Sequence, residues 1–239
     1  MSAWQYCALT DTGVRRKHNE DAIMSAPELG LWAVADGMGG HEAGDLASGM
    51  IVDALSSVER PSNFSLFVDA AEDALQTVNQ KIRAHSDREF EGRMMGSTVV
   101  ALLVSEGYGA CVWAGDSRLY RFRENALEQL SRDHSQVQRL VDAGVLSPDE
   151  ADSHPNANVI TKAVGGAAHL AVDVIMFDIQ PGDRFLLCSD GLYNELDPAA
   201  LADGFSNGTV EQIASTLLQG ALAAGARDNV SVIVVEASA

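Results

Sequence analysis

The sequence predicts an α+β fold, a sandwich of two β-sheets with helices on its outer sides. Short apolar runs rich in β-branched and aromatic residues recur along the chain, which is typical of strands. Several runs are apolar at every position, as in residues 31–34, and such a strand needs cover on both faces. Segments with helical periodicity lie between these runs, so helices are available to supply the outer cover.

Strands are expected wherever these apolar runs occur. They cover residues 30–35, 98–104, 110–114, 118–122, 172–177, 184–188 and 230–236. The longest apolar run, at residues 99–104, is far too short to span a bilayer, so no membrane segment is expected.

Helices are expected between the strands. The clearest covers residues 65–85, and one face carries Phe67, Ala71, Ala74, Val78 and Ile82. A second should follow Glu42. A third should begin at Thr209, because Thr209 and Gln212 have the spacing of a capping box. A fourth should begin at residues 147–150, where Pro148 would occupy the first helical position.

The length and charge limit the class of protein. At 239 residues, with no Pro/Ser-rich linker or repeat, residues 1–239 are expected to form a single domain. Thirty-four acidic residues against sixteen basic ones give a net charge of −18. Such a chain repels nucleic acid and anionic membranes, so neither is an expected partner. We expect a monomer.

Cysteine usage points to a reducing compartment. Cys7, Cys111 and Cys188 are odd in number, far apart and set in apolar stretches, which favours reduced thiols over disulfides or a zinc site. The N-terminal residues lack a basic segment followed by an apolar run. The expected location is the cytoplasm.

Acidic residues stand at the ends of predicted strands. Asp36, Asp116 and Asp190 each follow an apolar run, Asp228 precedes one, and Glu20-Asp21 adds a further acidic pair. One Asp-Gly after a strand is usually a turn. Several carboxylates at one sheet edge would repel each other and lose hydration, so their clustering makes sense mainly with cations. Oxygen ligands without clustered His or Cys favour Mg²⁺ or Mn²⁺.

Six short segments, in order along nearly the whole chain, resemble the motifs of the PPM phosphatases, also called protein phosphatase 2C, in their bacterial branch. They are Arg16-Lys17-His18-Asn19-Glu20-Asp21, Asp36-Gly37-Met38-Gly39-Gly40, Gly96-Ser97-Thr98, Gly115-Asp116-Ser117, Ser189-Asp190-Gly191 and Arg227-Asp228-Asn229. Each motif is weak alone, and their order makes the resemblance strong.

The resemblance implies a four-layer αββα sandwich of two antiparallel sheets with a binuclear Mg²⁺/Mn²⁺ centre at one end. By the match, Asp36 bridges the metals, Asp190 and Asp228 complete one site, and the Gly37 carbonyl serves the other. Glu20 and Asp21 match positions that hold that second metal directly or through water. Asp116 matches the position that, together with Asp190, holds a weaker third metal.

The implied activity is hydrolysis of phosphoserine and phosphothreonine in proteins. In such a reaction a hydroxide between the two metals attacks phosphorus directly, without a phosphoenzyme. Arg16 matches the arginine that binds the phosphate. Met38 stands where eukaryotic members carry a His, and a thioether donates no proton. The leaving-group proton is then left to a metal-bound water, His41 or His18.

Residues 134–165 match the flap near the active site of bacterial members and are read as a polar, mobile loop that shapes peptide specificity, with Lys162 where Arg is expected.

The expected partners are phosphorylated substrates of a cognate Ser/Thr kinase, and by analogy this includes secretion-system regulation. Three alternatives stay open. They are a catalytically silent PPM-like binding module, a metal-dependent hydrolase of nucleotides or nucleic acid, and a phosphatase of one regulatory phosphoprotein.

Overall fold

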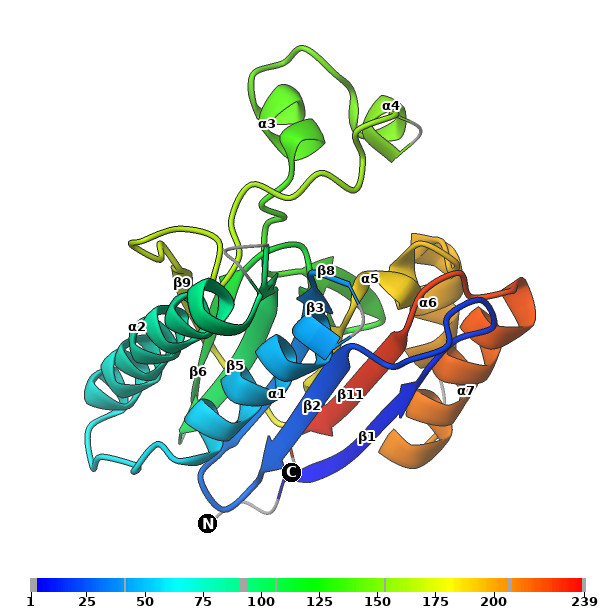
Figure 1. The fold of residues 1–239 in the computed structure, drawn as a ribbon. Coiled ribbons are helices and arrows are strands. Elements are labelled where there is room, and N and C mark those ends of the chain that lie inside the picture. Colours follow the sequence, from blue (N-terminus) through cyan, green and yellow to red (C-terminus); the bar gives the residue numbers. More distant parts are fainter. Residues whose placement is uncertain are drawn as a thin grey trace.

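Two antiparallel sheets form the centre of the molecule (Figure 1). The computed structural model describes residues 4–40, 42–90, 94–105, 107–152, 154–205 and 208–237, with the side chains of residues 149 and 152 excepted. One sheet has the order β1-β11-β10-β7-β8, and the other has the order β2-β3-β5-β6-β9, with β4 paired to β3.

The strands of the first sheet are β1 (Gln5–Asp11), β7 (Arg118–Arg123), β8 (Ala126–Gln129), β10 (Arg184–Cys188) and β11 (Val230–Glu236). Those of the second are β2 (Asp21–Ala26), β3 (Leu31–Met38), β4 (Gly96–Ser97), β5 (Val99–Ser105), β6 (Tyr108–Ala114) and β9 (Asp173–Asp178). The predicted two-sheet α+β architecture is therefore confirmed.

Strand β3 shows why both faces of a strand are apolar. Trp32 and Val34 point between the two sheets, where they pack with Phe185 and Ile233 of the other sheet. Leu31, Ala33 and Ala35 point the other way and pack under helices. All five β3 side chains are fully buried, so a polar residue at any of them would meet no water.

Helices cover the outer face of each sheet (Figure 1). Over the second sheet lie α1 (Glu42–Ser56) and α2 (Phe64–Glu89), and over the first lie α6 (Pro198–Phe205) and α7 (Val210–Ala224). The predicted capping box at Thr209 is present, and α7 ends at Gly225 with φ of 97°, where an L side chain would be strained. None of the helices in the described ranges has the length and apolar character that crossing a membrane requires.

Several elements depart from the expectations. Strands β1, β2, β4 and β8 were not predicted, because their sequences mix polar residues with Ala, Gly or Met instead of forming a continuous β-branched run. The stretch 134–165 contains two helices. The helix α4 (Pro148–Asp152) confirms the predicted helix start at residues 147–150, whereas α3 (Gln136–Asp142) was not predicted and replaces part of the expected loop. Figure 1 shows these two helices projecting from the end of the sandwich opposite the chain termini.

Candidate metal centre and active site

Carboxylates from both sheets meet at one end of the sandwich. In the second sheet, Asp21 of β2 is the register partner of Asp36 of β3. In the first sheet, Asp190 begins the short helix α5 (Asp190–Tyr193) just after β10, and Asp228 precedes β11. A cavity of about 690 Å³ opens between them, and its lining includes Asp36, Asp190 and Asp228 together with Glu20, Gly37 and Asp116.

Asp36 is held by backbone contacts while its carboxylate faces the other acids. Its N–H donates to Thr98 Oγ1 at 3.1 Å, and its carbonyl accepts from Thr98 N at 2.9 Å. Burial raises the pKa of Asp36 well above its usual value, and the charges of Asp21, Asp190, Asp116 and Asp228 raise it further. A carboxylate in this position is stable as an anion only beside a cation.

Asp21 joins the two sheets. Its Oδ2 accepts hydrogen bonds from Ser189 Oγ and Ser231 Oγ, both at 2.7 Å, and both serines belong to the opposite sheet region. Its Oδ1 is buried and has no hydrogen-bond partner. Burial raises the pKa of Asp21 to about 7, although the two serine hydroxyls favour the anion.

Asp190 and Asp116 also have raised pKa values, and the charge of Asp190 contributes to that of Asp116. Asp190 Oδ2 accepts from Asn194 Nδ2 at 3.1 Å, whereas the buried Oδ1 has no partner. Burial, followed by the charge of Asp228, raises the pKa of Asp190 to about 6. Burial, followed by the charge of Asp190, raises the pKa of Asp116 to about 7.

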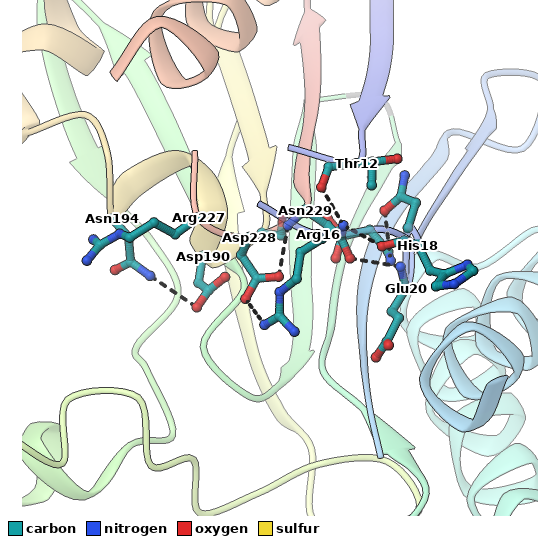
Figure 2. A network of polar contacts seen from close by, with 12 residues as sticks. Thr12, Arg16, His18, Glu20, Asp190, Asn194, Arg227, Asp228 and Asn229 are labelled. Carbon is teal, nitrogen blue, oxygen red and sulfur yellow. Dashed lines mark hydrogen bonds and ion pairs between the residues drawn. The ribbon is translucent and has the colours of Figure 1, made fainter. Parts of the chain in front are cut away.

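Arg16 reaches across to Asp228. Its Nη2 lies 2.6 Å from Asp228 Oδ2, and Figure 2 shows the guanidinium pointing toward the side of the site where Asp190 and Asp228 lie. The hydrogen bond that Arg16 donates to Asp228 raises the pKa of the guanidinium. About half of the Arg16 side chain is exposed, at 53%, so it can exchange Asp228 for another anion.

Asn229 fixes the loop that carries Arg16 and Glu20. Its Nδ2 donates to the carbonyls of Thr12 and His18 at 2.8 and 2.9 Å, and its Oδ1 accepts from Glu20 N at 2.8 Å (Figure 2). The sequence contains Asn229 inside a motif, but its three bonds to residues more than 200 positions away were not foreseen.

Gly37 and Glu20 pack against the first turns of α1. A Cβ at Gly37 would overlap the carbonyl oxygen of Gly44, so only glycine lets β3 approach the helix this closely. Glu20 Oε2 lies against Gly44 as well. The structure thus brings Glu20 beside the N-terminal part of α1, where the helix dipole favours a negative charge.

The donors fit a hard divalent cation. They are carboxylate and carbonyl oxygens, and two carboxylate oxygens, Asp21 Oδ1 and Asp190 Oδ1, are buried without partners. Within the described ranges no three His, Cys, Asp or Glu side chains form a complete ligand set. Mg²⁺ usually keeps several waters and takes only one or two protein carboxylates, so an incomplete protein ligand set is compatible with it.

The proposed proton donors are less well placed. His18 lies in the loop before Glu20, and Figure 2 shows its imidazole pointing away from Asp190 and Asp228. Met38 ends β3 beside Gly96. His41 lies outside the described residues.

The base of residues 134–165 is bonded directly to the Asp116 loop. His134 N donates to Gly115 O at 2.9 Å, and Gly115 N donates to His134 Nδ1 at 3.0 Å. The imidazole stacks on Trp113, and its Nε2 lies 3.2 Å from Asp173 Oδ2 without the alignment of a good hydrogen bond. Burial lowers the pKa of His134. Sequence reasoning missed His134, because a lone histidine in a polar stretch gives no signal.

Comparison with known proteins agrees with this geometry. The family model for protein phosphatase 2C matches residues 14–223. Serine/threonine protein phosphatase PstP of Mycobacterium tuberculosis is 34% identical over 97% of this chain and 45% of its own length, so the chain spans about half of that relative. Serine/threonine phosphatase Stp of Listeria monocytogenes is 34% identical over 95% of this chain and 93% of its own.

Solved structures extend the match to the whole fold. PppA, described as a key regulatory component of T6SS in Pseudomonas aeruginosa, is 42% identical with a TM-score of 0.92, over 99% of this chain and 98% of its own. The catalytic domain of PstP in complex with two manganese ions is 33% identical with a TM-score of 0.89, over 99% of both chains. The chain therefore belongs to the protein phosphatase 2C family, the PPM family whose bacterial members its six motifs resemble.

Proposed function

We propose that this protein is a metal-dependent protein serine/threonine phosphatase that hydrolyses phosphoserine and phosphothreonine in cytoplasmic proteins. The observation that carries the proposal is the group of buried carboxylates with raised pKa values and two unpartnered oxygens, which require a cation. The PstP structure that holds two manganese ions supports Mn²⁺ or Mg²⁺.

The proposed ligands divide between the two sheets. Asp36 would serve both ions, Asp190 and Asp228 one of them, and the Gly37 carbonyl the other. Glu20 and Asp21 would support that second ion directly or through water, and Asp116 with Asp190 would hold a weaker third ion. When bound, the ions neutralise phosphate charge and make water a stronger nucleophile.

Arg16 would bind the phosphoryl oxygens. A guanidinium can contact two oxygens at once, and Arg16 already points into the cavity toward Asp228. A cation bound by Asp228 would compete with Arg16 for this carboxylate. The side chain would then be released to hold the substrate phosphate.

Two of the alternatives lack a supporting observation. A catalytically silent binding module would not need the complete set of carboxylates that this chain retains. A hydrolase of nucleic acid would need a continuous basic groove, whereas the two cavities at the site are lined by more acidic than basic residues and the chain carries a net charge of −18. A phosphatase devoted to one regulatory phosphoprotein remains within the proposal. A cognate Ser/Thr kinase would supply the phosphorylated substrates, and the similarity to PppA supports a place in secretion-system regulation.

The test is turnover of p-nitrophenyl phosphate and of a phosphothreonine peptide with Mn²⁺, with Mg²⁺ and with EDTA. We expect both substrates to be hydrolysed only with metal. Hydrolysis that survives EDTA would contradict the metal assignment. Absence of turnover under every condition would favour the binding module.

A further inference from the structure

Basic side chains gather at the candidate active site although the protein as a whole is strongly acidic. The 690 Å³ cavity continues beside a second one of about 780 Å³, and the two share Arg16, Asp190 and Asp228. The chain contains sixteen Lys and Arg residues, and five of them line these cavities, namely Arg15, Arg16, Lys17, Arg118 and Arg227. Eight acidic residues line the same cavities, and five of them are the proposed metal ligands, so the positive charge left for a substrate depends on how each cation is paired.

Three of the five cations already pair with a carboxylate, Arg227 among them. Arg16 pairs with Asp228, and Arg118 donates three hydrogen bonds to Asp133. Arg15 and Lys17, by contrast, are exposed and make no hydrogen bond or ion pair with another described residue. Both residues line the cavity that holds Asp36.

Arg227 is anchored but keeps its outer nitrogens available. Its Nε donates to Glu195 Oε1 at 2.9 Å, and its backbone N donates to the same oxygen at 3.3 Å. No described residue contacts Nη1 or Nη2 by a hydrogen bond, and the side chain is 73% exposed. In Figure 2, Asp190 and Asp228 lie between the guanidinium groups of Arg227 and Arg16. Fixing Nε leaves the Nη1–Nη2 fork free to bind a carboxylate in two-point fashion.

Most carboxylates on the Arg227 side are already engaged, and Glu195 offsets part of the Arg227 charge. Asp133 is neutralised by Arg118, Glu195 is only 11% exposed and bonded to Arg227, and Asp197 Oδ1 accepts from Ala200 N at the start of α6. We define Arg15, Lys17 and Arg227 as the cationic rim. It borders the site from the Arg16 loop on one side and from α5 on the other.

We propose that the cationic rim selects phosphopeptides with acidic residues on both sides of the phosphorylated residue. The proposal rests on the phosphatase activity proposed above and specifies its substrate class. With the phosphoryl group at Asp36, Asp190 and Asp228, the neighbouring peptide residues pass Arg15 and Lys17 on one side and Arg227 on the other. At physiological salt the Debye length is about 8 Å, so the distant negative surface is screened, and most of the nearby carboxylates are engaged by Arg16, Arg118, Arg227 or the proposed metal ions.

The experiment compares three phosphothreonine peptides that carry Glu, Gln or Lys at the positions flanking the phosphothreonine, at 0.15 M salt with Mn²⁺. An exposed ion pair contributes enough for roughly a two- to fivefold effect. We therefore expect kcat/KM for the Glu peptide to exceed that for the Gln peptide about tenfold, mainly through KM, with the Lys peptide poorest.

Substitutions in the cationic rim test whether these residues cause the preference for acidic phosphopeptides. In Arg15→Gln/Lys17→Gln and in Arg227→Gln, the Glu-to-Gln ratio should fall several-fold while turnover of p-nitrophenyl phosphate stays unchanged. Lys81→Gln/Arg83→Gln on α2 changes the net charge as much as the double rim variant, away from both cavities, and should keep the wild-type ratio. In Arg227→Lys the charge remains but the fork is lost, so an intermediate ratio is expected.

The outcomes separate this inference from the proposed function. Equal turnover of the Glu and Gln peptides, or the same ratio in the rim and α2 variants, would overturn the inference while leaving the phosphatase activity intact. If Arg227→Gln lowered turnover of p-nitrophenyl phosphate and all peptides equally, Arg227 would bind the phosphoryl group and its place in the rim would be wrong. Absence of metal-dependent p-nitrophenyl phosphate turnover in the wild type would be a failure of the proposed function itself.

Discussion

Asp36 is the residue at which stability and function conflict most directly. Its carboxylate is buried among Asp21, Asp190 and Asp116, and each of these neighbours raises its pKa. In the metal-free protein an ionised Asp36 therefore opposes folding, and a divalent cation would remove the penalty. Because a buried acid of this kind lowers stability, its presence indicates a function for the negative charge, namely the binding of a cation.

We predict that Asp36→Asn loses at least about a hundredfold in kcat, because metal-ion stabilisation contributes several kcal/mol and 1.36 kcal/mol is a factor of ten. Without metal, the same variant should melt at a higher temperature than the wild type at pH 7.5, since the amide has the shape of the carboxylate without its charge. Steady-state kinetics and calorimetry in EDTA measure the two effects. Wild-type activity in the variant would disprove the role of Asp36 as a ligand.

The flap, defined here as residues 134–165, is the element whose attachment bears most on the site. The pair Ser135–Ile160 forms a β-bridge at its base, and Thr161 N donates to His134 O at 2.6 Å. His134 then joins this base to Gly115, the residue before Asp116. The orientation of the flap and the position of Asp116 therefore depend on the same imidazole.

We predict that His134→Leu, which leaves Gly115 N without an acceptor, destabilises the protein by about 1–3 kcal/mol. As a positioning residue, His134 should also affect KM more than kcat. We expect the KM for a phosphopeptide and the Mn²⁺ concentration at half-maximal activity to rise several-fold, with kcat for p-nitrophenyl phosphate at saturating Mn²⁺ nearly unchanged. His134→Asn places an acceptor near the Nδ1 position and should restore both values. A stability loss without any change in KM or metal requirement would mean a purely structural role.

At the scale of the whole molecule, the acidic cluster couples folding to pH and metal. The pKa values of Asp21, Asp116 and Asp190 in the folded protein, about 7, 7 and 6, lie above the unfolded value of 3.8. Between these values the folded state binds more protons than the unfolded state. Stability therefore falls as the pH rises from about 4 to about 7.

We predict that in EDTA the melting temperature decreases between pH 5.5 and pH 7.5, with a cost on the order of 2 kcal/mol for each carboxylate whose pKa of about 7 lies about 1.5 units above pH 5.5. With millimolar Mn²⁺ the slope should reverse, because metal binding requires deprotonated carboxylates. Scanning calorimetry at both pH values, with and without Mn²⁺, measures this. If the melting temperature had the same pH dependence with and without Mn²⁺, the carboxylates would not share a metal site. Asp36→Asn serves as the control, with a weaker dependence on both variables.

The sequence by itself determined the elements whose signals are local. The apolar run that becomes β11, the capping box at Thr209 and the six motifs each lie within a few neighbouring residues, so periodicity and spacing reveal them. The tertiary structure alone decided which charged and polar groups are paired. Arg16 meets Asp228 across 212 positions, and Asp21 meets Ser231 across 210. Burial and the pKa of a carboxylate depend on all the groups that surround it in space, and those groups come from strands of both sheets, distant in the chain.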